Sequence, residues 1–214
     1  MPPSLAAMKR RLQGHVQQGG LFRKVDLRSG QAFQSVWEGT AFEDSQLSMV
    51  HFVNSKWVHC NLDRTDIYGG NWNTASLHDV TFTGCDGEQI SFAGAVLRNV
   101  VFRDCRLAYS SFVGASLDNV LFDNCNLHGA DLDVAVATGV QYGKCNLWGV
   151  KSALSCAFWN SGFSVDDCRR FAALLARVHP DPKDKATLIG LAGEKTYAAV
   201  CRLMDNTDND APEF

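Results

Sequence analysis

The segment VVFRDCRLAYSSFVGASLDNVLFDNCNLHGA, residues 100–130, places a large apolar residue at every fifth position. Phenylalanine or leucine stands at positions 102, 107, 112, 117, 122 and 127, and cysteine recurs at 105 and 125. A continuous helix does not fit, because five residues rotate a side chain about 140° from its starting face. A continuous strand does not fit either, because an odd repeat sends alternate large residues to opposite faces. The chain must therefore turn a corner once per repeat.

Four such sides closing into one coil explain the recurrence at twenty residues. The five-residue register runs without interruption from Phe22 to Leu147. The central position of each repeat is Phe, Leu, Ile, Trp or Tyr, except at Ala32, Gly87 and Ala137. Residues twenty apart would then stack about 4.8 Å from each other in successive coils. The expected interior is solid and made of columns of like residues. One of these columns contains Cys85, Cys105, Cys125 and Cys145.

The stretches SFAGA, SFVGA, NLHGA and ADL resemble the pentapeptide-repeat proteins, whose repeat is approximately A(D/N)LXX. The resemblance covers residues 21–150 without a gap. It implies a mainly β fold, the right-handed quadrilateral parallel β-helix of that family, with the small residue and the Leu or Phe inside. This sequence often has Ser, Thr, Val or Arg where Asp or Asn is usual, so we expect the fold to be kept and the surface to be individual.

The pattern becomes helical outside the repeats. We expect a short N-terminal capping helix over residues 1–20, the β-helix over 21–163, a C-terminal α-helical cap over 164–205 and a disordered acidic tail over 206–214. The stripe that predicts the first helix consists of Leu5, Met8, Leu12 and Val16. Helical ends would cover the unpaired backbone that an open β-helix exposes.

Composition limits the classes of function. The chain of 214 residues is 46% hydrophobic, which is enough for a substantial core. No segment approaches the ~18 uncharged apolar residues of a membrane span, and the first twenty residues have no apolar run behind their charges, so we expect a cytoplasmic protein without membrane contact. A net charge of −3 without a basic stripe argues against direct nucleic-acid binding.

We expect no cofactor, no metal and no catalytic residues. Four thiols in a straight interior file cannot surround one ion tetrahedrally. The segment GLAGEKT, residues 190–196, lacks the spacing of a phosphate loop and no strand leads into it. A coil packed with Phe and Leu also leaves no concave pocket of the kind that small substrates need. The chain is therefore expected not to be an enzyme.

Function is then expected on the outer walls of the coil. The wall beside the cysteine column combines tyrosine and tryptophan with charged residues, a composition that protein interfaces favour. The expected partner-binding residues are Tyr68, Asp86, Glu88, Arg106, Tyr109, His128 and Trp148.

These features predict a non-enzymatic module that docks on a partner protein and neutralises or shields it. The leading hypothesis is an immunity or antitoxin role toward a bacterial toxin, for example a nuclease. The family also includes quinolone-resistance proteins that protect DNA gyrase, a type II topoisomerase, by imitating DNA. Residues 21–150 hold 14 Asp or Glu and 9 Lys or Arg, a low charge density for that alternative. A structural or secretion-associated scaffold is the third alternative, and both a monomer and an end-to-end dimer remain open.

Overall fold

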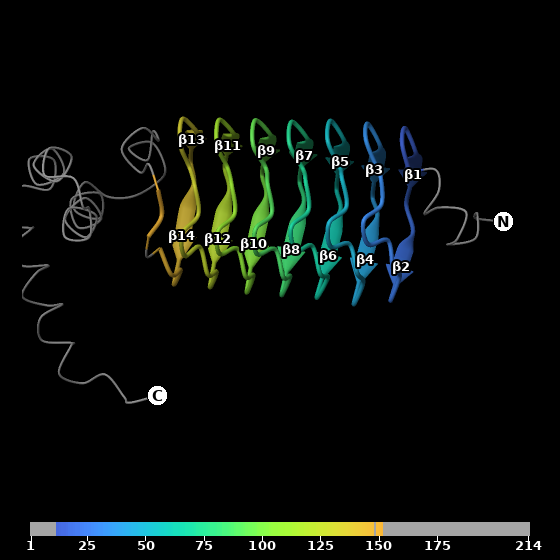
Figure 1. The fold of residues 1–214 in the computed structure, drawn as a ribbon, viewed down its shortest axis with the longest axis horizontal. Helices are drawn as coiled ribbons and strands as arrows, with labels where there is room; N and C mark the ends of the chain where they lie inside the picture. The colour runs from blue at the N-terminus through green and yellow to red at the C-terminus, as the bar shows by residue number, and fades with distance from the viewer. Residues whose placement is uncertain (1–11, 148, 152–214) are drawn as a thin grey trace, which may run out of the picture. The chain divides into compact units, whose positions relative to one another are not determined.

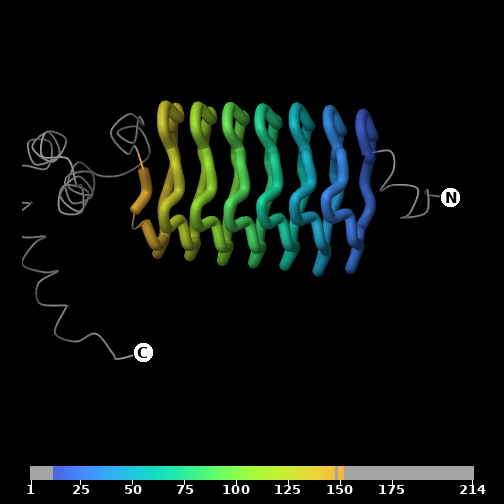
Figure 2. The backbone as a smooth tube through the Cα atoms, viewed as in Figure 1, coloured from blue at the N-terminus to red at the C-terminus, as the bar shows by residue number. Residues whose placement is uncertain are grey.

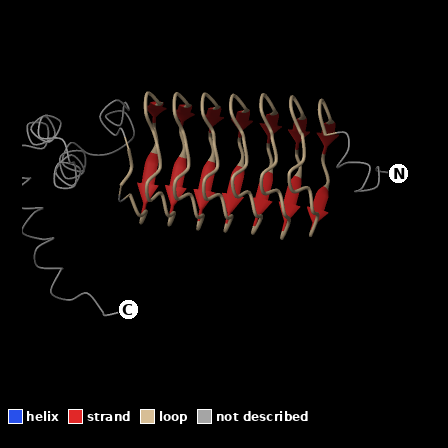
Figure 3. Cartoon of the chain, in the orientation of Figure 1, coloured by secondary structure: helices blue, strands red, loops and turns tan. Residues whose placement is uncertain are grey.

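The chain forms a four-sided parallel β-helix in the computed structural model, which describes residues 12–147 and 149–151 (Figure 1). All described residues belong to the compact unit Met1–Gly162. They form strands, single bridges and turns (Figure 3), and none of them belongs to a helix that could cross a membrane. The predicted mainly β solenoid is confirmed.

Two seven-stranded parallel sheets form two sides of the coil. The first sheet contains β1 (Val16–Gln18), β3 (Val36–Glu38), β5 (Lys56–Val58), β7 (Ser76–His78), β9 (Val96–Arg98), β11 (Ser116–Asp118) and β13 (Val136–Thr138). The second contains β2 (Leu21–Arg23), β4 (Ala41–Glu43), β6 (Asn61–Asp63), β8 (Thr81–Thr83), β10 (Val101–Arg103), β12 (Leu121–Asp123) and β14 (Gln141–Gly143).

The pairing register is twenty residues throughout, as the spacing predicts. Phe102 in β10 lies opposite Phe82 in β8 and Phe122 in β12. The other two sides of each coil are held by single bridges, such as Asp86 with Arg106 and Ser91 with Ser111. Every coil therefore follows the same path as the one before it (Figure 2).

The corners are made by residues in the left-handed backbone region. In one coil these are Asp104, Tyr109, Gly114 and Asn119, with φ between 54° and 64°. Such a φ turns the chain from one side of the coil onto the next, and most non-glycine residues adopt this conformation at a cost in free energy. The ladder between coils compensates, because each corner amide donates to a carbonyl of the next coil, as Tyr109 does to His128 at 2.8 Å.

The interior is filled, as predicted. Phe102 is fully buried and stacks on Phe82 and Phe122, with ring centroids 4.7 and 5.1 Å away. Gly87 leaves no void, because a Cβ there would lie 3.0 Å from Leu107 Cδ2 and 3.3 Å from Ile67 Cδ1. The neighbouring coils have filled the space that the missing side chain would occupy.

The predicted boundary between an N-terminal helix and the coil at residue 20 is wrong. Leu12 is 1% exposed and lies in the coil interior, and Val16–Gln18 form β1. The five-residue register continues backward from Phe22 through Gln17 to Leu12, and the polar Gln17 conceals it in the sequence. The remaining expected segments, 1–11, 152–163, 164–205 and 206–214, lie outside the described residues.

Candidate protein-binding face

Six of the seven expected interface residues lie on one wall of the coil, and Trp148 lies outside the described residues. We call this wall the candidate face. It consists of a row of bridge residues and of the residues two and three positions after each of them. The bridge residues are Asp26, Gln46, Asp66, Asp86, Arg106, Asn126 and Asn146.

Several bridge residues stabilise the turns that follow them. A carboxylate or amide oxygen accepts the backbone N–H two residues later, at 3.0 Å from Asp66 to Tyr68 and at 3.2 Å from Asn126 to His128. This is the Asx turn that Asp and Asn favour. Asp86 makes the same contact with the Glu88 amide at 3.4 Å, so its carboxylate has a structural role besides any role in binding.

Arg106 lies between the two carboxylates of the preceding coil. Its Nη1 is 3.5 Å from Asp86 Oδ2 and its Nη2 is 3.1 Å from Glu88 Oε2. The Glu88 hydrogen bond and the Asp86 charge raise the pKa of the Arg106 guanidinium. The arginine side chain remains 64% exposed, so the cluster is open to a partner. Exposed ion pairs of this kind contribute little to stability.

Tyr109 and His128 form a polar aromatic pair at the corner of the candidate face. Tyr109 Oη lies 3.0 Å from His128 Nε2, and the rings meet edge to face with centroids 5.1 Å apart. A Cβ on Gly129 would lie 2.8 Å from the tyrosine ring, so the absence of a side chain there lets the ring lie across the next coil. Tyr109 is 55% exposed despite these contacts.

Met49 belongs to this face, although it is not among the interface residues that the sequence predicts. It occupies the corner position three coils before Tyr109 and is 51% exposed. Its side chain reaches over Gly69 as the Tyr109 ring reaches over Gly129. The signal was present in the spacing of sixty residues between Met49 and Tyr109, with a glycine twenty residues after each. Met49, Tyr68 and Tyr109 together give this face an exposed apolar corner.

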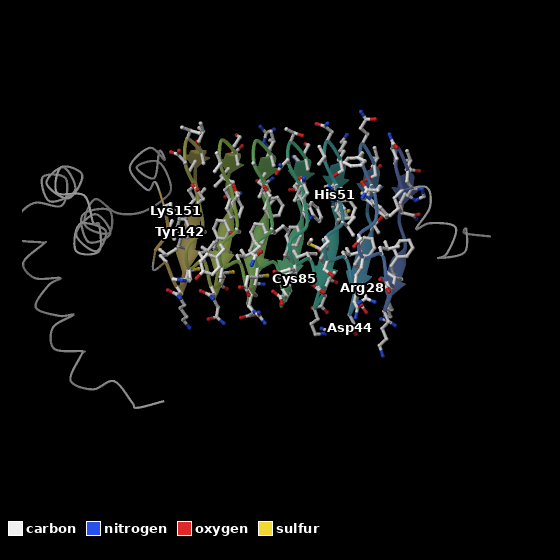
Figure 4. The ribbon with its side chains drawn as sticks, viewed as in Figure 1. Arg28, Asp44, His51, Cys85, Tyr142 and Lys151 are labelled. Atoms are coloured by element: carbon white, nitrogen blue, oxygen red, sulfur yellow. The ribbon has the colours of Figure 1, made fainter. Side chains whose placement is uncertain are left out.

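Carboxylates on the other walls are largely paired between coils. Arg23 binds Glu43 at 2.6 Å, Arg64 binds Asp44 at 2.8 Å, and Arg98 binds Asp118 at 3.0 Å. Figure 4 labels Asp44 among these outer side chains. The hydrogen bond from Arg64 lowers the pKa of Asp44. These walls therefore present alternating charges instead of a continuous acidic surface.

The cysteines of the column pack as small core residues, and their thiols donate hydrogen bonds to backbone carbonyl oxygens. Cys125 Sγ lies 3.3 Å from the Phe102 oxygen and 3.4 Å from the Asp123 oxygen. Hydrogen bonding to Cys105 and burial raise the pKa of Cys125 to about 12. A thiol that stays protonated at neutral pH is a poor nucleophile and a poor metal ligand.

Two histidines share one carboxylate at another corner. Nδ1 of His78 and Nδ1 of His59 lie 2.8 and 3.3 Å from Asp79 Oδ2. The hydrogen bond from Asn99 and the charges of the two histidines lower the pKa of Asp79. Among the residues that the structure describes, no group of three His, Cys, Asp or Glu side chains is arranged to hold a metal ion.

Comparison with known proteins identifies the repeat. Residues 50–132 match the family model of the pentapeptide repeat region. No curated protein matches the chain in sequence.

Similar solved structures are themselves distant in sequence. Trypsin-treated QnrB1, a plasmid-mediated fluoroquinolone resistance protein, is 16% identical over 66% of this chain and 84% of its own, with a TM-score of 0.37. A pentapeptide repeat protein from the thylakoid lumen of Arabidopsis thaliana is 18% identical over 62% and 72%, with a TM-score of 0.33. HetL, from the cyanobacterium Nostoc, is 16% identical over 68% and 90%, with a TM-score of 0.20. No functional inference follows from these similarities, and the fold of this chain rests on its own strand pairing.

Proposed function

The chain is a pentapeptide-repeat protein, and from this premise we propose that it is a non-catalytic module that docks on a partner protein through the candidate face. The observation that supports the proposal is the exposed apolar corner of Met49, Tyr68 and Tyr109 beside the Asp86–Arg106–Glu88 cluster. Exposed aromatic and methionine side chains next to fixed charges are typical of interface centres.

The rigidity of the face favours binding. Its backbone is held by ladders to both neighbouring coils, and Tyr109 is fixed by His128 and by the flat surface at Gly129. A side chain that is ordered before binding loses less conformational entropy on docking. The face can therefore bind without rearrangement of the coil.

The partner that we propose is a bacterial toxin with a basic surface, such as a nuclease, which the chain would neutralise in the cytoplasm as an immunity protein or antitoxin. The bridge residues and the residues after them carry four carboxylates, Asp26, Asp66, Asp86 and Glu88, against the two guanidiniums of Arg28 and Arg106. This excess of negative charge would attract a basic partner, and its effect would weaken as salt screens it.

Quantitative affinity capture from the native host tests the docking site. The bait is the full chain, and the test variant carries Tyr68→Ala and Tyr109→Ala. A protein that is captured by the wild type and lost with this variant would support the proposal. The matched control is Leu21→Ala, an exposed apolar residue outside the candidate face, and it should retain the partner. Equal capture by both variants would remove the assignment of the face.

Protection of a type II topoisomerase by DNA mimicry is the alternative that the paired carboxylates disfavour. A substitute for DNA needs a dense array of negative charge, and here arginines neutralise Glu43, Asp44 and Asp118. A gyrase supercoiling assay with and without a quinolone separates the two proposals. Protection at micromolar protein would establish the alternative, whereas absence of any effect would reject it.

A further inference from the structure

The wall that follows the candidate face around the coil has a different composition, and we call it the amide wall. It consists, in five successive coils, of a bridge residue and of the residues two and three positions after it. The bridge residues are Gln31, His51, Asn71, Ser91 and Ser111, of which Figure 4 labels His51. The residues after them are Phe33, Gln34, Val53, Asn54, Asn73, Thr74, Ala93, Gly94, Val113 and Gly114.

Ion-pairing side chains are absent from the amide wall. None of its positions holds Asp, Glu, Lys or Arg, and His51 is its one titratable side chain. By contrast, Arg23, Glu43 and Asp63 follow one another along the second sheet. A ligand that binds through ion pairs, such as a nucleic acid, finds no lysine or arginine on the amide wall.

Two asparagines of the amide wall are held by contacts to the backbone. The Oδ1 of Asn71 accepts the backbone N–H of Asn73 at 3.1 Å. The Oδ1 of Asn73 accepts the hydroxyl of Ser91 at 2.5 Å and the backbone N–H of Ala93 at 3.1 Å. A backbone N–H can only donate, so these contacts fix which end of each side-chain amide is the oxygen.

The nitrogen of each of these two amides is available to a ligand. Within the described part of the chain, the Nδ2 atoms of Asn71 and Asn73 have no protein hydrogen-bond partner, and neither atom is buried. Each amide nitrogen carries two N–H donors, so the pair presents four donors of fixed orientation on an uncharged surface. Donors that are ordered before binding lose less conformational entropy when a ligand binds.

Small apolar surfaces lie beside these donors. Phe33, Val53, Ala93 and Val113 are half-buried, and no residue of the amide wall is among the large exposed apolar residues of the described chain. The Phe33 ring packs against the His51 ring, with centroids 5.8 Å apart. The wall therefore lacks the exposed aromatic anchors of the candidate face, on which protein partners typically dock.

We propose that the amide wall binds a neutral glycan chain. The N–H groups of Asn71 and Asn73 donate to hydroxyl or acetamido oxygens of the glycan, and Phe33 and Val53 contact the apolar C–H faces of its sugar rings. Phe33 and Asn73 lie two coils apart, about 10 Å along the axis, so one chain of several sugar rings reaches both. The wall is separate from the candidate face, and this proposal does not depend on the proposed function.

The chemistry of the wall favours a glycan over a second copy of the chain. The oxygens of Asn71 and Asn73 already accept hydrogen bonds, so a second amide wall would bring N–H donors opposite N–H donors. A glycan instead carries many oxygen acceptors and no charge. Because a flat wall contacts only one side of such a chain, we expect weak binding, with a dissociation constant in the millimolar range.

Nuclear magnetic resonance of the full ¹⁵N-labelled chain, titrated with chitopentaose and separately with cellopentaose, tests the proposal. Both probes are neutral β-linked chains, and only the first carries acetamido groups. At least one of them should shift the side-chain amide signals of Asn71 and Asn73 in a saturable way, while the signals of Arg23 and Asp63 on the second sheet stay in place. Absence of shifts with both probes at millimolar concentration, or shifts confined to other walls, would overturn the proposal.

Replacement of the amide nitrogens tests the role of the donors. Asn71→Asp and Asn73→Asp keep the oxygen that accepts the protein hydrogen bonds and remove the N–H groups. Each should raise the dissociation constant of the bound probe by about two- to tenfold. Asn61→Asp makes the same change at an exposed position in β6, outside the wall, and should have no effect. Unchanged binding by both wall variants, or an equal loss with Asn61→Asp, would contradict recognition by these amides.

Discussion

At the scale of single residues, side chains of the same type have different structural roles. Asp66 holds a turn, Asp44 pairs with an arginine, and Asp86 does both. Tyr109 is a corner residue with φ of 57° and is also the most exposed tyrosine of the candidate face. Residue type alone therefore does not separate structural residues from binding residues on this surface.

The thiols of the column should be unreactive in the folded protein. The pKa of Cys105 is raised to about 12, as is that of Cys125, although contact with Cys125 acts to lower the former. Both side chains are at most 2% exposed. The thiols therefore stay protonated, and a reagent in solution does not reach the sulfur atoms. Iodoacetamide labelling followed by peptide mass spectrometry should find these two cysteines unmodified until the protein is unfolded. Rapid labelling under native conditions would contradict the buried column.

The Asp44–Arg64 pair predicts a component of acid sensitivity. The folded pKa of Asp44 lies below its ordinary value of 3.8, so the stabilising contribution is present above that value and is lost as pH falls through the folded pKa. Asp44→Asn should therefore lower the melting temperature at neutral pH more than at pH about 2. Differential scanning fluorimetry at the two pH values measures this difference. An equal shift at both would show that the pair does not couple to pH.

At the scale of the elements, stability comes from columns that cross several coils. The strands have three residues each and could not be stable alone, since isolated short strands lack enough buried surface. The Phe82, Phe102 and Phe122 rings join β8, β10 and β12, with interplanar angles of 10° and 5°. The aromatic column thus makes each strand depend on its neighbours on both sides.

Removal of one ring from the column should be costly. Phe102→Ala should lower the free energy of unfolding by about 3–5 kcal/mol, because it removes a fully buried ring and leaves a cavity between two fixed ones. Urea denaturation followed by circular dichroism measures the change. Phe33→Ala, at a half-buried outward position, is the comparison and should cost clearly less. Similar losses at both positions would argue against the stacked column.

A substitution that restores the repeat at Gly87 should destabilise the protein. Leucine is the usual residue in this column, yet Leu107 and Ile67 already occupy the space at Gly87. Gly87→Leu should therefore cost about 1–3 kcal/mol through overpacking. The denaturation midpoint of this variant, compared with that of the wild type, tests this prediction. A more stable variant would mean that a real void exists at Gly87.

At the scale of the whole described coil, stability should decrease from the centre to the ends. Phe82 and Phe102 are fully buried, whereas Phe22 and Tyr142, in the first and last strand of the same sheet, are only partly buried. Local opening is easier where fewer buried apolar contacts hold an element in place. Hydrogen exchange should therefore be slowest in β7 to β10 and faster in β2 and β14. Uniform exchange along the chain would indicate a single cooperative unit.

Much of the fold could be predicted from the sequence because the interior is periodic. A backbone ladder between identical coils requires the same number of residues in each, so the spacing of Phe, Leu and Cys sets the register directly. The prediction failed at the first coil, where Gln17 breaks the apolar pattern while the backbone continues its path to Leu12. The polar side chain of Gln17 therefore hid β1 in the sequence pattern, although pairing with the neighbouring coil keeps the backbone on the same path.

The sequence by itself determined the four-sided coil, its register, its solid interior and the wall on which Tyr68, Asp86, Arg106 and Tyr109 lie. Only the tertiary structure decided which outward side chains meet: Tyr109 with His128 over Gly129, Arg106 between Asp86 and Glu88, and Met49 on the same corner. The physical reason is that inward side chains must fill a volume that repeats from coil to coil. The rotamer of an outward side chain depends instead on the particular neighbours that the adjacent coils place beside it.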